Sequence, residues 1–500
     1  METLNYAVLK QSGYDGYILE KAPEKVLQFG EGNFLRAFVD YFFDCANEKA
    51  GWDGKCVLMQ PIAPGLTELI NKQEGLYTLY LRGRENGEKV DRKRVISAVS
   101  RCMNPYEEAG YAQWMQLAES DDLEYIVSNT TEAGIVYDPE SSYDQMPPHS
   151  FPAKLTKFLH KRFQAGKKGL VILSCELIDN NGKELKKCVE QHIKDWNLGD
   201  EFAAWVENEN LFCSTLVDRI VPGRIRSKEE VARLEEVNGY HDELIDVGEV
   251  FGVWVIEGPA WLEDKLPFKK AGLNVMVVPD VTPYKKRKVR LLNGAHTGFV
   301  PGSYLSGENI VRDCMNNPVI SGFMNKMLSD EIIPTVPLPK EELDEFAASI
   351  KDRFNNPFVD HQLLDISLNS TSKWRARNLP SLKGYVEKYG KLPACLTASL
   401  AAYIAFYSDE IVRREENALI CRRPAGNEYP VRDDAWVLDF YWDHRADNAH
   451  DLVAAVLQNT QMWGEDLTKI AGLAAKTEEN LTAIRENGAL SVFEAAQKEQ

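Results

Sequence analysis

The chain has 500 residues, of which 44% are hydrophobic and 27% charged, a composition typical of a globular protein large enough for two domains. Its formal net charge of −18 argues against a nucleic acid as the main partner, because phosphate backbones are bound by basic surfaces. No apolar run approaches the roughly 18 residues that cross a membrane, and the start METLNYAVLK lacks the features of a secretion signal.

The first half of the chain alternates apolar runs of strand length with helical patterns. Strands are expected at 25–29, 56–60, 124–129 and 169–174, and two later strands at 250–258 and 273–278. A helical pattern at 34–49 follows the first of them. This alternation indicates a parallel sheet that helices cover on both faces.

The second half of the chain is mostly helical in its spacing of apolar residues. Helical patterns occupy 319–332, 340–354, 394–416 and 466–488. The predicted fold is therefore an α/β N-terminal Rossmann-like domain with a mostly α-helical C-terminal domain. We expect the first domain at residues 1–245 and the second at 246–500, with strands in 246–285 returning to the first.

Two glycines directly follow the first predicted strand. In KVLQFGEGNFLRAF, Gly30 and Gly32 lie between a strand and a helix, where a dinucleotide pyrophosphate binds to backbone N–H groups. Leu35 replaces the third glycine of the usual pattern, and no acidic residue for the adenine ribose is evident after the second strand. Arg36 is either a phosphate or substrate contact or a solvated helix residue.

A second polar group follows the strand at 124–129. Asn129, Thr130 and Glu132 lie where the carboxyl edge of a parallel sheet presents ligand contacts. The same residues also fit the N-terminal cap of a helix. Both roles are compatible with this position.

The segment KKRKVRLLNGAH combines Lys288, Asn293 and His296, three residues suited to reducing a carbonyl. A lysine can donate the proton when burial and nearby cations lower its pKa, and an asparagine amide can stabilise the developing oxyanion. On a straight helix the three fall within an arc of about 140°, with Lys288 and His296 about 12 Å apart along the axis. The alternative is a basic helix start followed by a hydrogen-bonded core histidine.

This K-x-R-x-L-N-x-x-H pattern resembles the polyol-specific long-chain dehydrogenases, the mannitol dehydrogenase family. FGEGNFLRAF, SNTTEAGI (128–135), STLVDRIVPG (214–223) and VWVIEG (253–258) are similar to its other signatures, in the same order. The resemblance implies a metal-independent, NAD-dependent oxidoreductase whose active site lies between a nucleotide-binding domain and a helical domain. It also implies that Lys288 is the general acid/base, that Asn293 polarises the carbonyl, and that His296 orients the substrate.

The resemblance further implies which residues contact the cofactor, which we expect to be NAD, with NADP not excluded. The expected cofactor-binding residues are Gly30, Gly32, Asn33, Phe34, Arg36, Asn129, Thr130 and Glu132. No metal is expected, since the histidines show no metal-ligand spacing. Nine cysteines without CxxC pairs suit reduced thiols, so we expect a cytoplasmic protein.

Within the family, LSCELIDNNG and NSTSKWRARNLPSL are most similar to the members that act on a sugar acid, which we expect as the small-molecule partner, with no nucleic acid or membrane. Lys373, Arg375 and Arg377 are candidates for binding its carboxylate, the alternative being a solvated basic loop. The rival interpretations are a family member acting on another sugar acid such as fructuronate, a member acting on mannitol or fructose, and a non-catalytic dinucleotide-binding sensor.

The chain departs from the mannitol-type members at one position. Those members carry C-D-N where this sequence has Cys175, Glu176 and Leu177. The second amide that would help Asn293 hold the oxyanion is therefore missing, or is supplied by Asn180 or Asn181.

Overall fold

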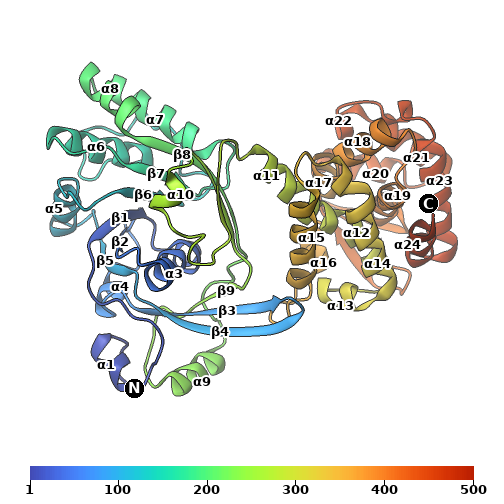
Figure 1. Cartoon of the computed structure of the whole chain (residues 1–500). Coiled ribbons are helices and arrows are strands. Elements are labelled where there is room, and N and C mark those ends of the chain that lie inside the picture. Colours follow the sequence, from blue (N-terminus) through green and yellow to red (C-terminus); the bar gives the residue numbers. More distant parts are fainter. Residues whose placement is uncertain (500) are drawn as a thin grey trace. The chain divides into compact units, whose positions relative to one another are not determined.

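The computed structural model describes residues 1–499 and contains two compact units (Figure 1). The first unit comprises Met1–Arg82 and Val90–Val281, and the second comprises Gly83–Lys89 and the chain from Thr282. The strands expected at 250–258 and 273–278 therefore belong to the first unit.

An eight-stranded sheet forms the centre of the first unit, in the order β11-β10-β8-β7-β6-β1-β2-β5. Every neighbouring pair from β5 to β8 is parallel, whereas β10 is antiparallel to β8 and parallel to β11. The strands are β1 (Glu24–Phe29), β2 (Lys55–Met59), β5 (Val99–Met103), β6 (Tyr125–Ser128), β7 (Val171–Ser174), β8 (Leu211–Asp218), β10 (Val253–Glu257) and β11 (Val275–Val278). The chain runs outward from β1 to β2 and β5 and then returns to β6, so the strand order reverses between β1 and β6.

Helices cover both faces of this sheet, because successive side chains of each buried strand point to opposite sides. Leu27 and Phe29 of β1 pack in one apolar cluster with the helices that follow β5, β6 and β7, whereas Val26 packs in another with the aromatic helix after β1. The covering helices are α3 (Tyr41–Ala50), α5 (Glu108–Leu117), α6 (Phe151–Gln164), α7 (Asn181–Asp195) and α8 (Asp200–Glu209). Figure 1 shows α6, α7 and α8 beside β6, β7 and β8.

A second, three-stranded sheet in the order β4-β3-β9 was not expected from the sequence. It consists of β3 (Tyr77–Glu85), β4 (Glu88–Ile96) and β9 (Asp246–Glu249). The remaining helical elements of this unit are α1 (Tyr6–Gln11), α2 (Asn33–Leu35), the π-helical η1 (Arg36–Asp40), α4 (Thr67–Lys72), α9 (Lys228–Asn238) and α10 (Leu262–Lys265). The helix predicted at 34–49 is thus one continuous helical run with a π segment inside it.

The second unit is mostly helical, as predicted. Its core is α19 (Ala394–Ser408), which is apolar on all sides and packs against α12 (Gly294–Leu305) and α23 (Leu473–Asn487). The other helical elements are α11 (Thr282–Arg287), η2 (Lys288–Asn293), α13 (Val311–Asn316), α14 (Pro318–Lys326), η3 (Met327–Ile332), η4 (Ile333–Thr335), α15 (Lys340–Phe354), α16 (Leu363–Ile366), α17 (Ser370–Arg377), α18 (Leu379–Tyr389), α20 (Ala435–Asp443), α21 (Ala449–Gln458), α22 (Thr460–Trp463), η5 (Leu467–Lys469) and α24 (Ala489–Lys498).

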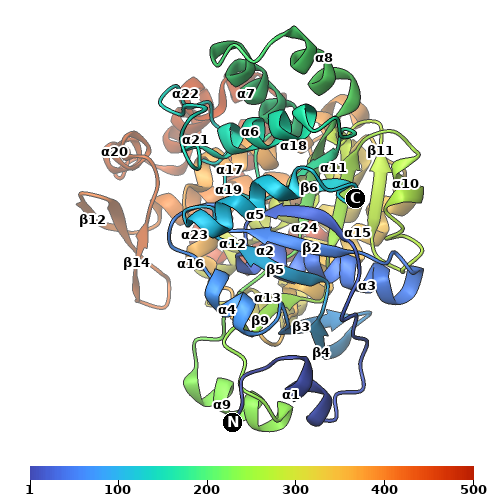
Figure 2. The same cartoon turned by 90° about the vertical axis from the view of Figure 1, so that its left-hand side faces the viewer.

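One helical prediction in this unit extends too far. The pattern at 394–416 predicts a single helix, but the helix ends at Ser408 and the chain continues into a small antiparallel sheet. That sheet consists of β12 (Ile411–Glu415), β13 (Ala418–Arg422) and β14 (Glu428–Val431), and Figure 2 shows it beside α20. No helix formed by residues 1–499 combines the length and apolar character needed to span a bilayer.

Candidate functional site

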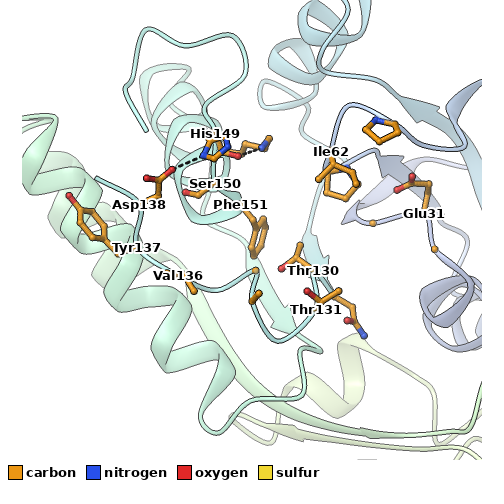
Figure 3. Close-up of a pocket in the computed structure, with 18 residues that line it drawn as sticks. Glu31, Ile62, Thr130, Thr131, Val136, Tyr137, Asp138, His149, Ser150 and Phe151 are labelled. Atoms are coloured by element: carbon orange, nitrogen blue, oxygen red, sulfur yellow. Dashed lines mark hydrogen bonds and ion pairs between the residues drawn. The ribbon is translucent and has the colours of Figure 1, made fainter. Parts of the chain in front are cut away.

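A cavity of about 800 Å³ opens in the first unit where β1 and β6 end (Figure 3). Open α/β sheets bind ligands at this point, where the strand order reverses. The lining residues come from the segments that follow β1, β2 and β6 and from the start of α6: Gly30, Glu31, Gly32, Pro61, Ile62, Pro64, Asn129, Thr130, Thr131, Ala133, Gly134, Val136, Tyr137, Asp138, His149, Ser150, Phe151 and Lys154.

The glycine turn has the shape that a pyrophosphate group requires. Gly30 has φ +124°, and a Cβ atom there would lie 3.0 Å from Cδ1 of Leu35. Gly32 is exposed at the cap of α2 and has open space where a side chain would stand. A phosphate can therefore approach the backbone N–H groups at the start of the helix, so the turn fits a dinucleotide.

Glu176 holds the other side of the cavity in place from the end of β7. Its buried carboxylate accepts hydrogen bonds from the backbone N–H and Oγ1 of Thr130, each at 3.0 Å, and from Oγ of Ser128 at 3.2 Å. Burial raises the pKa of this carboxyl group. Thr131, which follows Thr130 in the chain, has φ +68°. β-branched residues rarely adopt this conformation, so backbone strain is stored at the cavity wall.

The structure brings half of the expected cofactor-binding residues together at the cavity. Gly30, Gly32, Asn129 and Thr130 line it. The lining does not include Glu132, which is exposed.

The expected contacts just after the glycine turn point elsewhere. Oδ1 of Asn33 accepts a hydrogen bond from Arg36, and the ring of Phe34 stacks on Phe38 with ring centres 5.2 Å apart. Neither residue is on the cavity lining. Both side chains contact residues of the helix that follows the turn.

Arg36 is a correction to the sequence interpretation, because its side chain is neither a ligand contact nor solvated. The residue is 0% exposed, and its guanidinium donates to the carbonyl oxygen of Leu244 at 2.7 Å and lies 3.8 Å from a carboxylate oxygen of Asp246. The planar group also covers the ring of Tyr77 at 4.9 Å. Arg36 therefore joins the glycine turn to β9 inside the unit.

In the second unit, Lys288 and Asn293 are the first and last residues of η2, a π-helical segment, and His296 follows in the first turn of α12. The straight α-helix assumed from the sequence is therefore wrong for residues 288–293. A π-helix closes its hydrogen bonds over five residues and is frequently found at functional sites. The segment changes the angular offset between Lys288 and His296.

His296 is a neutral hydrogen-bonding group in a cationic environment. Its ring stacks on Phe354 with centres 4.0 Å apart, and its buried Nε2 atom has no hydrogen-bond partner among residues 1–499. Burial lowers its pKa well below the usual range, and His361, Arg353, Arg377 and Lys373 lower it further. An unsatisfied buried nitrogen is costly, so it is well suited to bind a ligand hydroxyl.

The basic segment at 373–377 lies on a helix, α17, and its three cations point in different directions. Lys373 and Arg377 are one helical turn apart and act on His296, and Arg377 donates to Oγ1 of Thr297 at 3.1 Å. Arg375 is exposed, and its guanidinium lies against Gly464 at the end of α22. The predicted clamp is therefore reduced to Lys373 and Arg377.

The structure distinguishes between Asn180 and Asn181, the two candidates for the second amide donor to the oxyanion. Asn181 is fully buried; its Nδ2 donates to the carbonyl oxygens of Glu176 and Thr215, and its Oδ1 accepts from the Thr215 N–H. Asn181 cannot reach a substrate, so the prediction that it could supply the second amide donor is wrong. Leu177 and Asn180 are both exposed, which leaves Asn180 as the candidate.

Several residues of both sites were missed by sequence reasoning. Glu31 lies between the two glycines, and its place in the motif was the one signal available. His361, whose ring centre lies 5.4 Å from that of His296, and Phe354 come from a segment far along the chain that had no recognisable motif. No group of three or more His, Cys, Asp and Glu side chains within residues 1–499 is arranged to hold a metal ion.

Comparison with known proteins agrees with this description. Residues 24–270 match the mannitol dehydrogenase Rossmann domain, and residues 280–485 match the mannitol dehydrogenase C-terminal domain. A protein of Cronobacter sakazakii named altronate oxidoreductase is 45% identical over 93% of this chain and 95% of its own length. One of the same name from Bacteroides thetaiotaomicron is 43% identical over 94% of this chain and 96% of its own.

Two solved structures share the fold over the whole chain. Substrate-free D-sorbitol dehydrogenase has a TM-score of 0.81 at 21% identity, with 99% of this chain and 100% of that chain covered. Mannitol 2-dehydrogenase of Pseudomonas fluorescens, solved with NAD and D-mannitol, has a TM-score of 0.65 at 22% identity, with 100% of both chains covered.

The fold defines a Rossmann-type α/β unit with a ligand cavity at the switch point of its sheet, joined to a helical unit with a cationic cluster around a neutral histidine. This confirms the predicted fold class. The chain belongs to the mannitol dehydrogenase family, which confirms the resemblance found in its sequence.

Proposed function

We propose that this protein is an NAD-dependent oxidoreductase that reversibly reduces tagaturonate to altronate. The observation that carries the proposal is the polar cluster of the second unit, in which Lys373 and Arg377 accompany His296 and its unsatisfied Nε2 atom. A sugar acid needs a cationic site for its carboxylate as well as donors for its hydroxyls. The relatives at 43–45% identity are named altronate oxidoreductase, which supports the same substrate class.

The cavity of the first unit would bind the cofactor that carries the hydride. Gly30 and Gly32 would hold the pyrophosphate on backbone N–H groups, and the loop at Asn129 and Thr130, which Glu176 fixes, would contact the remainder. Bound NADH provides the hydride. The first unit would therefore orient the cofactor, and the helical second unit would provide the groups that act on the substrate.

Lys288 donates a proton to the carbonyl oxygen during reduction and accepts it back during oxidation. The Asn293 amide stabilises the charge that develops on that oxygen without itself titrating. His296, which is neutral because burial and surrounding cations lower its pKa, binds a substrate hydroxyl through Nε2. Lys373 and Arg377 bind the carboxylate. Nine free cysteines, eight of them buried and one partly buried, favour a reducing, cytoplasmic location.

The first test is oxidation of NADH with tagaturonate, fructuronate and fructose compared side by side. We expect tagaturonate to be turned over much faster than the other two. Preference for fructuronate would keep the carboxylate site and change the sugar, whereas preference for fructose would remove the need for a carboxylate site. No turnover with any of them, together with intact NADH binding, would favour the dinucleotide-binding sensor.

The second test is Lys288→Ala, with Lys286→Ala as a matched control. Lys286 is an exposed lysine two residues away, so its replacement removes the same charge without reaching the site. We expect Lys288→Ala to lower kcat by about 10²–10⁴-fold, the usual contribution of a general acid, while the Kd for NADH stays unchanged. A Lys288→Ala variant that keeps most of the activity would refute the assignment of the proton donor.

A further inference from the structure

The segment after β2 lacks the charged residue that usually decides between NAD and NADP. In a Rossmann fold an acidic residue there binds the ribose hydroxyls of NAD, or a nearby arginine binds the extra phosphate of NADP. Here the segment reads Gln-Pro-Ile-Ala-Pro (60–64) and is uncharged. The Gln60 amide is occupied locally, since Nε2 donates to the carbonyl oxygens of Ile62 and Ala63.

A carboxylate reaches the same place from a different strand. Glu31 is 7% exposed and lines the cavity together with Pro61, Ile62 and Pro64. Its Oε1 lies 3.4 Å from the backbone N–H of Leu66, the residue that caps α4 at the end of the segment after β2. Figure 3 shows Glu31 and Ile62 close together at one end of the cavity, with Tyr137 and Asp138 at the other.

The Glu31 carboxylate is part of the cavity wall, where a ligand can reach it. The backbone N–H groups of Leu66 and of Glu31 itself donate to the carboxylate, and the hydrogen bond from Leu66 goes to Oε1. A carboxylate on a cavity wall is a strong acceptor for hydroxyl groups, because hydrogen bonds to a charged oxygen are stronger than those to a neutral one. The cavity therefore offers a negative acceptor at its β2 end.

We propose that Glu31 accepts hydrogen bonds from the adenine ribose hydroxyls and so selects NAD over NADP. The inference rests on the proposed function, since it requires a dinucleotide in this cavity. The glycine turn would then bind two parts of the cofactor: Gly30 and Gly32 leave room for the pyrophosphate, and Glu31 between them binds the ribose. A 2′-phosphate carries about −1.5 to −2 charges at neutral pH and would be repelled by this carboxylate.

Lys154 also lines the cavity, and a lysine there could bind the extra phosphate of NADP. Its Nζ donates to the carbonyl oxygen of His149 at 2.6 Å, and burial lowers its pKa to about 8. The ammonium group of Lys154 is therefore engaged by a carbonyl oxygen of its own chain. This makes it a poor partner for a phosphate dianion.

The test is a fluorescence titration of the purified protein with NADH and with NADPH. We expect the wild type to bind NADH at least about tenfold more tightly than NADPH, the usual effect of a charged hydrogen bond. In Glu31→Gln the amide keeps the contact with Leu66 but loses the charge, and the ratio of the two Kd values should fall about tenfold. Glu68→Gln is the matched control, because Glu68 is exposed on α4 and lies outside the cavity lining.

The outcomes separate this inference from the function on which it rests. Equal weakening of both dinucleotides in Glu31→Gln would mean that Glu31 only supports the turn. A wild type that binds NADPH as tightly as NADH would also overturn the inference, whatever the variant does, and Lys154→Met would then be the variant that loses NADPH. Binding of neither dinucleotide to the wild type would refute the proposed function itself.

Discussion

Replacing Arg36 by methionine removes a buried cation from the helix that follows the glycine turn. The guanidinium donates to the carbonyl oxygen of Leu244 at 2.7 Å and to Oδ1 of Asn33 at 2.8 Å. It also donates to the carbonyl oxygen of Glu31 at 3.2 Å and lies 3.8 Å from Asp246. Methionine fills most of the same volume but leaves these acceptors without a donor and Asp246 without a counter-charge.

The expected loss of stability is large for one substitution. Removing one partner of a buried ion pair costs about 3–5 kcal/mol, and the separation of 3.8 Å places this pair near the lower end. We therefore expect a loss of about 3 kcal/mol at pH 8, equivalent to a fall in Tm of about 6 °C. The pKa of Asp246 is already raised to about 6, so at pH 5.5 this carboxyl group takes up a proton and the loss should be smaller.

The assay is urea unfolding followed by tryptophan fluorescence, at pH 8 and at pH 5.5, together with NADH titration of the folded protein. Arg233→Met is the control, since Arg233 is exposed and pairs with Glu230 on the surface of α9; no measurable change is expected. The reasoning is refuted if Arg36→Met unfolds like the wild type but binds NADH at least tenfold more weakly. That result would support the alternative prediction from the sequence, in which Arg36 contacts a phosphate of the cofactor.

Three further predictions follow from individual residues. Gly30→Ala should cost about 1–3 kcal/mol and weaken NADH binding, because φ +124° is strained for alanine and its Cβ would press on Leu35; wild-type stability would contradict this. The pKa of Asp40 is raised to about 7, so its contribution to stability is present below pH 4 and is lost as the pH rises through 7. Urea unfolding should therefore show Asp40→Asn gaining on the wild type between pH 5 and 8, and a constant difference would count against it. Arg377→Ala should raise KM for the sugar acid about tenfold, with Arg375→Ala as the unaffected control; equal effects would reject the division of α17 into two faces.

The sequence predicted six of the eight strands of the large sheet, because strands buried on both faces read as short apolar runs, but it did not predict β5 or β8. The small sheets were missed for the opposite reason. β4 exposes most of its residues and reads EKVDRKRVI, and β12 follows a long apolar helix without an intervening turn signal. Their strands form because neighbouring strands pair with them, and a single sequence does not display that pairing.

The candidate sites show the same division between local and long-range information. Lys288, Asn293 and His296 could be recognised because they share one short segment. The burial of Arg36 could not be anticipated, since its partners at Leu244 and Asp246 lie more than two hundred residues away in the chain. Arg375 was grouped with Lys373 and Arg377 because the segment was treated as a possible loop, whereas helical spacing separates it from them.

The π-helical segment at 288–293 has a consequence for how the proposed proton donor is aimed. Because each turn of a π-helix holds more residues than a turn of an α-helix, the segment acts as one surplus residue within an otherwise α-helical run. Removing a single residue between 289 and 292 would let the run close as an α-helix and rotate everything before it by about 100° relative to His296. The direction of Lys288 is thus set by chain length in this segment and can be lost without replacing any of the residues that take part in the chemistry.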